Sequence, residues 1–159
     1  MKNYTFTIVG DNDVGKSTFI NRLANGQFTN EQNDEQIINW ENNVVIHTTT
    51  NQDTNVNSDG LVLMFDIHNP KSFEHLEKYL ILDKPMVLVG NKCDVKYEED
   101  GINEGVDEND DGTFSNTENR WYVKKWRELQ QGNTKMKFYE ISSKSNYNFD
   151  KPFNALITV

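Results

Sequence analysis

Cysteine and long apolar runs are scarce in this chain of 159 residues, whose one cysteine is Cys93. A single thiol excludes an intrachain disulfide, so we expect an intracellular protein in a reducing compartment, cytoplasmic or nuclear. No apolar run approaches the roughly 20 residues that a membrane-spanning helix needs. The final residues, ALITV, contain no cysteine that could carry a prenyl group, so we also expect no membrane anchor.

Basic residues are also few, because 16 lysines and arginines face 25 acidic residues, for a formal net charge of −9. An acidic surface repels nucleic acid and anionic lipid, so we expect neither as a partner. The acidic residues are concentrated in the segment 98–118. We therefore predict a single domain over residues 1–159, with 95–116 as an acidic, solvated loop inserted into it.

Segments typical of strands and of helices alternate along the chain. Strands are predicted from β-rich or apolar runs at 4–9, 61–65, 86–89 and 136–141. Helices are predicted from apolar spacing at 18–25, 71–82, 118–131 and 149–159. Two more runs, 37–38 and 44–46, flank a polar turn and predict a hairpin, whereas the polar segment 48–60 predicts a loop. The alternation indicates an α/β fold with a mostly parallel central sheet and helices on both faces.

The sequence GDNDVGKS at residues 10–17 matches the phosphate-loop pattern G-x-x-x-x-G-K-[ST] and lies between a strand and a helix. In such a loop, main-chain N–H groups surround a β-phosphate, and the helix N-terminus adds partial positive charge. We expect Lys16 to reach the β- and γ-phosphates and Ser17 to bind Mg²⁺. The predicted phosphate-binding residues are Asp13, Val14, Gly15, Lys16, Ser17 and Thr18.

The sequence NKCD at residues 91–94 follows the apolar strand 86–89, at the sheet edge where open α/β folds bind nucleotides. The Asp94 carboxylate can accept hydrogen bonds from the N1–H and the 2-amino group of guanine. Adenine offers no such pair of donors, so it would leave the carboxylate unpaired at a cost in affinity. Together with the phosphate loop, the motif predicts a guanine-nucleotide site.

At these motifs the chain resembles the Ras superfamily of small GTPases. The sequence PMVLVGNKCD at 85–94 looks like the fifth strand and base motif of that family, and KSF at 71–73 is similar to the start of its third helix. The segment 138–153, FYEISSKSNYNFDKPF, resembles most closely the Ran branch. The resemblance implies the P-loop NTPase fold of small GTPases and GTP or GDP as ligand with Mg²⁺. It also implies nuclear-transport factors as protein partners.

The resemblance further assigns residues around the base. It implies that main-chain N–H groups of Ser142 and Ser143 meet guanine O6, and that Lys144 packs on the ring. Phe28 has the spacing from Ser17 of the family's aromatic residue that packs against the base. The implied guanine-binding residues are Phe28, Asn91, Lys92, Asp94, Ser142, Ser143 and Lys144.

The two switch regions depart from the family pattern. Where the family has Asp-x-x-Gly-Gln, this chain has TTTNQ at 48–52, so only Gln52 survives as a candidate catalytic residue. The first switch is several residues short, and Thr29 is the only threonine near the expected position of a second Mg²⁺ ligand. Asn12 and Asp13 replace glycines that are common in the phosphate loop.

Two functional hypotheses remain open at this point. One is a GTPase whose hydrolysis is slow, with Gln52 orienting water. The other is a pseudo-GTPase that holds nucleotide for structure and presents a surface to protein partners, without a productive cycle. Both retain nucleotide binding, and they differ in turnover.

A calcium-loop pattern also occurs, because DENDDGTFSNTE at 107–118 matches D-x-[DN]-x-[DN]-G-x₅-E at every specified position. The alternative is an Asn/Asp-rich solvated loop that ends in a capping box, Ser115 to Glu118, at the start of the next helix. The preceding residues make a poor helix, and no partner loop exists. We favour the solvated loop and expect no tight Ca²⁺ site at 107–118.

Overall fold

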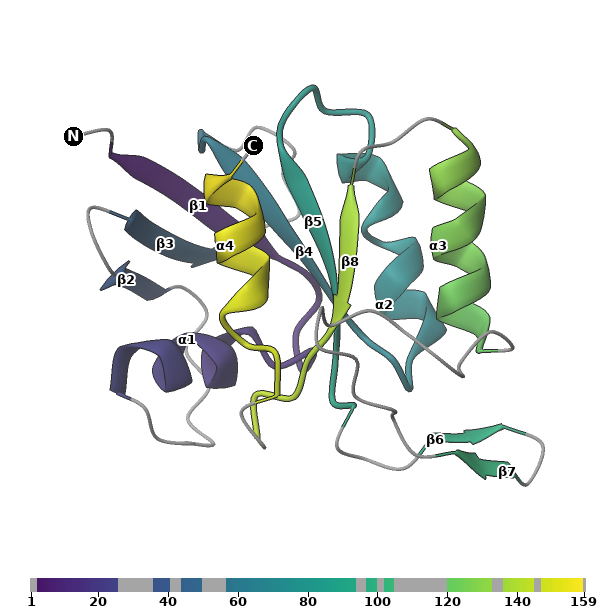
Figure 1. The fold of residues 1–159 in the computed structure, drawn as a ribbon. Coiled ribbons are helices and arrows are strands. Elements are labelled where there is room, and N and C mark those ends of the chain that lie inside the picture. The colour runs from purple at the N-terminus through teal and green to yellow at the C-terminus, as the bar shows by residue number, and fades with distance from the viewer. Residues whose placement is uncertain are drawn as a thin grey trace.

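The computed structural model describes residues 3–25, 36–40, 44–49, 57–93, 97–99, 102–104, 120–132, 136–144 and 147–158. Figure 1 shows the helices and strands in these ranges. In chain order they are β1 (Tyr4–Val9), α1 (Lys16–Asn25), β2 (Gln36–Trp40), β3 (Val44–Thr49), β4 (Gly60–Asp66), α2 (Pro70–Glu74), the 3₁₀-helix η1 (Glu77–Tyr79), β5 (Met86–Asn91), β6 (Tyr97–Glu99), β7 (Ile102–Glu104), α3 (Trp121–Gln131), β8 (Lys137–Glu140) and α4 (Lys151–Ile157).

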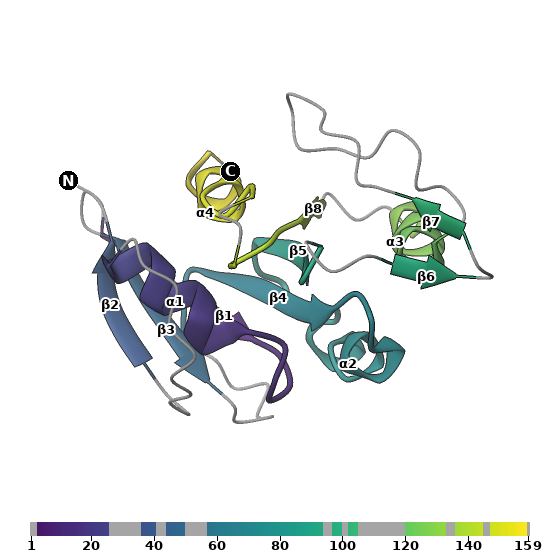
Figure 2. The ribbon, with the colours of Figure 1, turned by 90° about the horizontal axis from the view of Figure 1, so that it is seen from below.

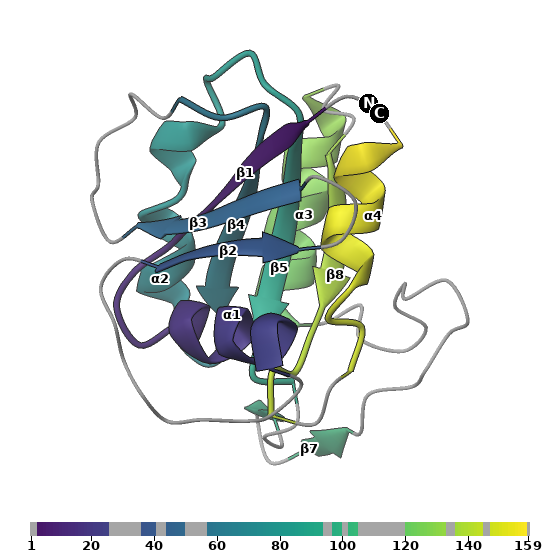
Figure 3. The ribbon, with the colours of Figure 1, turned by 90° about the vertical axis from the view of Figure 1, so that its left-hand side faces the viewer.

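The main sheet has six strands in the order β2-β3-β1-β4-β5-β8. The neighbours β3-β1, β1-β4, β4-β5 and β5-β8 are parallel, and β2 pairs antiparallel with β3 as the hairpin predicted at 37–46. Figure 3 shows this β2–β3 edge facing the viewer. The prediction of an α/β fold with a mostly parallel sheet is confirmed.

Side chains of the central strands alternate between two cores, one on each face of the sheet. In β4, Val62 and Met64 enter a core under α1 and α4, whereas Leu61, Leu63 and Phe65 enter a core under α2 and α3. We call these the α1/α4 core and the α2/α3 core. Figure 2 shows α4 and α2 on opposite sides of β4. Because both faces are covered, the strands can consist of the continuous apolar runs seen in the sequence.

The single helix predicted at 71–82 is instead α2 followed by η1. Successive i→i+3 bonds run through this stretch, from the Leu76 N–H to the Phe73 carbonyl (2.9 Å) and from the Tyr79 N–H to the Leu76 carbonyl (2.9 Å). Phe73, Leu76 and Tyr79 are all buried in the α2/α3 core. A 3₁₀-helix has three residues per turn, so the spacing of these side chains places them on one face of the segment.

Several other predicted segments also differ from the structure. The inserted segment 95–116 contains the short antiparallel pair β6–β7, so it is not wholly a loop. Figures 1 and 3 show this hairpin beyond the carboxyl ends of the parallel strands. The helix predicted from Glu118 begins at Trp121, and the loop predicted at 48–60 loses Thr48 and Thr49 to β3. None of the described helices is both long and apolar enough to cross a bilayer.

Candidate nucleotide-binding site

The loop 10–15 connects the carboxyl end of β1 to α1 through two glycines that no other residue could replace without a clash. Gly15 has φ +99, and a Cβ atom added there would lie 2.3 Å from Nδ2 of Asn91. A Cβ atom on Gly10 would lie 2.3 Å from the carbonyl oxygen of Met64. Asp13 also adopts a positive φ, of 66. The two glycines of the sequence pattern thus have a steric cause in this fold.

Lys16 is buried inside this loop, with 5% of its surface exposed. Its ammonium group donates to the main-chain carbonyl oxygens of Gly10 (2.6 Å) and Asp11 (2.5 Å). The Phe19 N–H donates to the Gly15 carbonyl (2.9 Å), so α1 starts directly at the loop. A fixed cation beside a helix N-terminus makes an electropositive loop that is suited to a polyphosphate.

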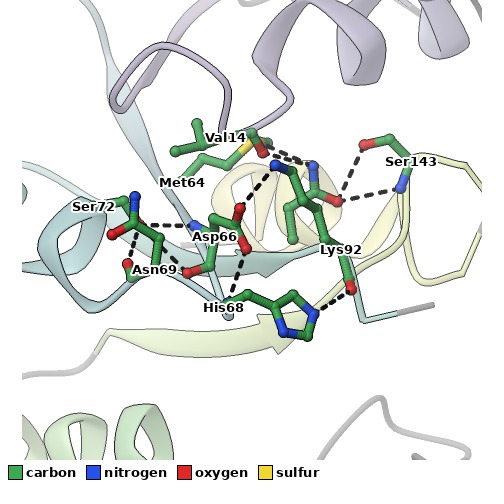
Figure 4. Close-up of polar contacts among 9 residues, drawn as sticks. Val14, Met64, Asp66, His68, Asn69, Ser72, Lys92 and Ser143 are labelled. Atoms are coloured by element: carbon green, nitrogen blue, oxygen red, sulfur yellow. Dashed lines mark hydrogen bonds and ion pairs between the residues drawn. The ribbon is translucent and has the colours of Figure 1, made fainter. Parts of the chain in front are cut away.

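Asn91, the last residue of β5, joins the loop to a third segment of the chain. Its buried amide Nδ2 donates to the Val14 carbonyl (2.9 Å) and lies 4.0 Å from Sδ of Met64. Its Oδ1 accepts from the Ser143 main-chain N–H (3.3 Å) and hydroxyl (3.4 Å). Figure 4 shows Val14 and Ser143 on either side of this contact. One side chain therefore sets the position of the phosphate-loop pattern relative to residues 142–144.

Lys92 follows in a left-handed conformation, with φ 69. Its ammonium group forms an ion pair with Oδ2 of Asp66 at 2.8 Å, and the other Asp66 oxygen accepts from the His68 N–H at 2.8 Å. The His68 ring Nε2 lies 3.3 Å from the Lys92 carbonyl oxygen. Figure 4 shows these contacts, with Ser72 and Asn69 beyond Asp66. The chain leaving β5 is thus fixed to the end of β4.

Residues 142–144 form a turn that is closed by two hydrogen bonds between Ser142 and Tyr147, each 3.2 Å long. Ser142 and Ser143 are buried, and Lys144 is exposed. The Cys93 N–H donates to the Ile141 carbonyl (3.2 Å), which ties this turn to the segment after β5.

Arg22 of α1 donates to the Lys144 carbonyl oxygen at 3.2 Å. The helix that follows the phosphate-loop pattern is thereby linked to the turn at 142–144 as well. Three segments that are distant in the sequence meet at one edge of the sheet, through Asn91 at their centre and Arg22 at their rim.

The structure places most of the predicted site residues at this edge. Those it brings together are Asp13, Val14, Gly15, Lys16, Ser17, Thr18, Asn91, Lys92, Ser142, Ser143 and Lys144. Four others lie outside the described residues: Phe28, Thr29, Gln52 and Asp94. The calcium-loop pattern at 107–118 lies outside them too. In the part of the chain that is described, no group of three or more His, Cys, Asp or Glu side chains could hold a metal ion.

Two side-chain contacts at this edge were not anticipated from the sequence. One is the Asp66–Lys92 ion pair, and the other joins Asp11 to His75, whose Nδ1 lies 2.6 Å from Oδ2 of the aspartate. Asp66 is the register partner of Asn91 at the ends of β4 and β5. The rule that parallel strands end at one edge could therefore have identified Asp66, whereas no sequence pattern connects Asp11 to His75.

Comparison with known proteins places the chain in a family. The model of the Ras family matches residues 46–159. The chain belongs to the Ras family. It is also similar to the Ras-related protein RabN1 of Dictyostelium discoideum. The two are 24% identical over an alignment of 188 positions, which covers 98% of this chain and 81% of that protein. The predicted small-GTPase fold and superfamily are confirmed, and a Ras-family domain is a GTP-binding domain. The family match begins after the loop 10–17, so the assignment of that loop depends on its own sequence pattern and geometry.

Proposed function

We propose that this domain binds GDP and GTP at the edge formed by the loop 10–17 and the segments 91–94 and 142–144. The observation that supports the proposal most directly is the buried Asn91 side chain, which contacts both Val14 and Ser143. These contacts hold a phosphate-binding element and a base-binding element at a fixed separation. A nucleoside diphosphate, which has a phosphate end and a base end, fits such an arrangement.

At the phosphate end, residues 13–18 would surround the phosphates with main-chain N–H groups, and Lys16 would supply a fixed positive charge. The ammonium is already directed into the loop by two main-chain carbonyls, which a phosphate oxygen would replace as its partner. The Ser17 hydroxyl is a hard oxygen ligand of the kind that Mg²⁺ prefers, and Thr29 is the candidate second ligand. Bound Mg²⁺ would neutralise phosphate charge there.

At the base end, Asp94 would accept from guanine N1–H and the 2-amino group. Main-chain N–H groups of Ser142 and Ser143 would donate toward O6, while Lys92, Lys144 and Phe28 would pack around the ring. The buried turn at 142–144 supports this assignment, because its position is fixed by Asn91 and by the Ser142–Tyr147 bonds. Adenine has an amino group where guanine has O6, so the same donors would disfavour it.

Turnover is proposed to be slow or absent. Thr48 stands where the family has its switch aspartate, and it is buried in β3, 3% exposed, in register with Ile8. A neutral threonine inside a strand cannot replace a carboxylate that reaches toward Mg²⁺ and water. Gln52 would be left as the candidate residue that orients water.

The alternative is a pseudo-GTPase, a nucleotide-stabilised module for protein interaction. The replacement at Thr48 favours it as much as it favours slow hydrolysis, so turnover decides between the two. In either case the likeness of 138–153 to the Ran branch makes nuclear-transport factors candidate partners, in the cytoplasm or the nucleus. The resemblance alone supports those partners.

Binding is tested by titrating nucleotide-stripped protein with a fluorescent GDP, with and without Mg²⁺. Lys16→Ala is expected to weaken binding by about 3 kcal/mol, because a charge-assisted hydrogen bond is lost. Lys71→Ala is the matched control, since it removes the same charge from the exposed start of α2. Ser17→Asn should chiefly reduce Mg²⁺-dependent GTP binding. Equal affinities for the unaltered protein and Lys16→Ala would contradict the phosphate assignment.

Turnover is tested in a single-turnover assay on GTP-loaded protein. We expect a rate at or below about 10⁻⁴ per second, the slow intrinsic level of such domains. A much faster rate that Gln52→Leu abolishes would show a working hydrolytic site and exclude the pseudo-GTPase. Absence of any hydrolysis above the rate of free GTP would exclude the slow enzyme instead.

A further inference from the structure

A buried charged cluster lies next to the base end of the proposed site. Arg120 precedes α3, Tyr122 is in its first turn, and Glu140 is the last residue of β8; they are 4%, 0% and 2% exposed. Arg120 donates to the Tyr122 hydroxyl (2.8 Å) and to Oε1 of Glu140 (3.3 Å). The Tyr122 hydroxyl in turn donates to the same oxygen of Glu140.

The cluster contributes little to the stability of the fold. Burial raises the pKa of the Glu140 carboxyl, although the Tyr122 hydroxyl and Arg120 pull in the opposite direction. The other carboxylate oxygen, Oε2, has no hydrogen-bond partner among the described residues. The free-energy cost of desolvating two charges offsets most of the stabilisation from their attraction. Well-packed apolar side chains would therefore stabilise the fold equally well. What a buried ion pair supplies is a fixed geometry between the segments that carry it.

The cluster joins two segments of the chain, one before α3 and one at the end of β8. Arg120 lies where the chain returns to the domain after the insertion 95–116, and Glu140 lies two residues before Ser142. The Glu140 carbonyl accepts from Nδ2 of Asn148 at 3.2 Å, just past the turn that Ser142 and Tyr147 close. Glu140 is therefore connected to both ends of that turn. It precedes Ser142 by two residues, and its carbonyl oxygen is hydrogen-bonded to Asn148.

The same strand end also orders the segment after β5. The Ile141 N–H donates to the Gly90 carbonyl (2.8 Å), and the Ile141 carbonyl accepts from the Cys93 N–H (3.2 Å). Glu140 is in register with Gly90 across the β5–β8 pair. A shift of Glu140 would thus move the turn at 142–144 and residues 91–93 together.

We propose that Arg120, Tyr122 and Glu140 act as positioning residues for guanine selectivity, by fixing the end of β8 so that the turn at 142–144 presents its main-chain donors to O6 of the base. The inference rests on the proposed nucleotide site and adds to it three residues that contact no ligand themselves. It links the exit of the acidic insertion to base recognition.

The test compares GDP with the diphosphate of 2-aminopurine riboside, which keeps the 2-amino group but lacks O6 and, with it, the N1–H. The N1–H is lost equally for every variant, so the change in the ratio of the two Kd values between variants is the measured quantity. In Glu140→Gln the Kd for GDP should rise about tenfold, the size of one lost hydrogen bond, while the Kd for the analogue stays within about twofold. Tyr122→Phe removes only the hydroxyl and keeps the packing volume, so it should fold even where Glu140→Gln does not. For Tyr122→Phe we expect about a threefold rise for GDP alone.

Leu156→Ala is the control for general destabilisation. Leu156 is buried in α4 beside Gly60, at the start of β4 and so at the opposite end of the sheet. It should leave the ratio of the two Kd values unchanged. Equal weakening of both ligands in Glu140→Gln and Tyr122→Phe, or no change for either ligand, would overturn the positioning role. If the unaltered protein did not prefer GDP to the analogue, the proposed base site itself would fail, and this inference with it.

Discussion

Both faces of the sheet bury apolar side chains, and the α2/α3 face also buries a charged cluster. In the α1/α4 core, Phe153 stacks on Phe19 and Phe6, with ring centroids 5.6 and 6.4 Å apart. In the α2/α3 core, aromatic rings surround a phenol that donates to a buried carboxylate. Burial of uncharged rings stabilises a fold directly, whereas burial of charges mainly fixes which groups face each other. Because apolar burial occurs on both faces, we infer that the charged cluster of the α2/α3 face adds geometry at the site rather than stability.

The largest expected effect is on the α1/α4 face. Phe153→Ala should lower the free energy of unfolding by about 3–5 kcal/mol, because a fully buried ring is replaced by a cavity. Ile157→Ala, at the exposed end of the same helix, is the control and should cost less than about 1 kcal/mol. Denaturant unfolding measures both. If Phe153→Ala shifted nucleotide selectivity in the folded protein, the division between the two faces would be wrong.

A smaller effect, with a distinctive pattern, is expected on the α2/α3 face. Arg120→Met leaves the Glu140 carboxyl buried without its cation and should cost about 3 kcal/mol. Adding Glu140→Gln to it should recover at least about 1 kcal/mol, because the uncompensated charge is gone. Strictly additive losses in the double-mutant cycle would mean that the two side chains do not act as a pair.

The smallest effect concerns the Asp11–His75 contact between the loop 10–15 and the end of α2. The two side chains are 23% and 52% exposed, so solvent screens their interaction. His75→Ala should change the free energy of unfolding by less than about 1 kcal/mol. A loss above about 2 kcal/mol, measured by the same denaturant unfolding, would show that this surface contact matters as much as a buried one.

The sheet and the strand-to-helix setting of the loop 10–17 were predictable because their signals are local. Continuous apolar runs such as 61–65 indicate strands that are buried on both faces, and the spacing in GDNDVGKS reflects the steric demands at Gly10 and Gly15. The segment 71–82 was predicted only in part. Phe73, Leu76 and Tyr79 are spaced by three, a pattern that both an α-helix and a 3₁₀-helix accommodate over such a short stretch.

Two contacts that join distant segments could not be predicted. Arg120 and Glu140 are 20 residues apart, and Asp11 and His75 are 64 apart, with no shared pattern in the sequence. The pair β6–β7 consists of strands of three residues held by main-chain bonds. Strands this short cannot be detected from hydrophobic periodicity. Positions of this kind follow from the fold, so the structure was needed to find them.

Nucleotide competition tests the central claim most directly. Stripped protein loaded with fluorescent GDP is challenged with GTP, ATP and XTP, for the unaltered chain and for Asp94→Asn. We predict that GTP displaces the probe at concentrations at least about a hundredfold lower than ATP, because adenine would leave the Asp94 carboxylate without hydrogen-bond donors. Asp94→Asn should weaken GTP and favour XTP, whose C2 carbonyl can accept from the new amide. Equal displacement by GTP and ATP in the unaltered protein would contradict a guanine-nucleotide site.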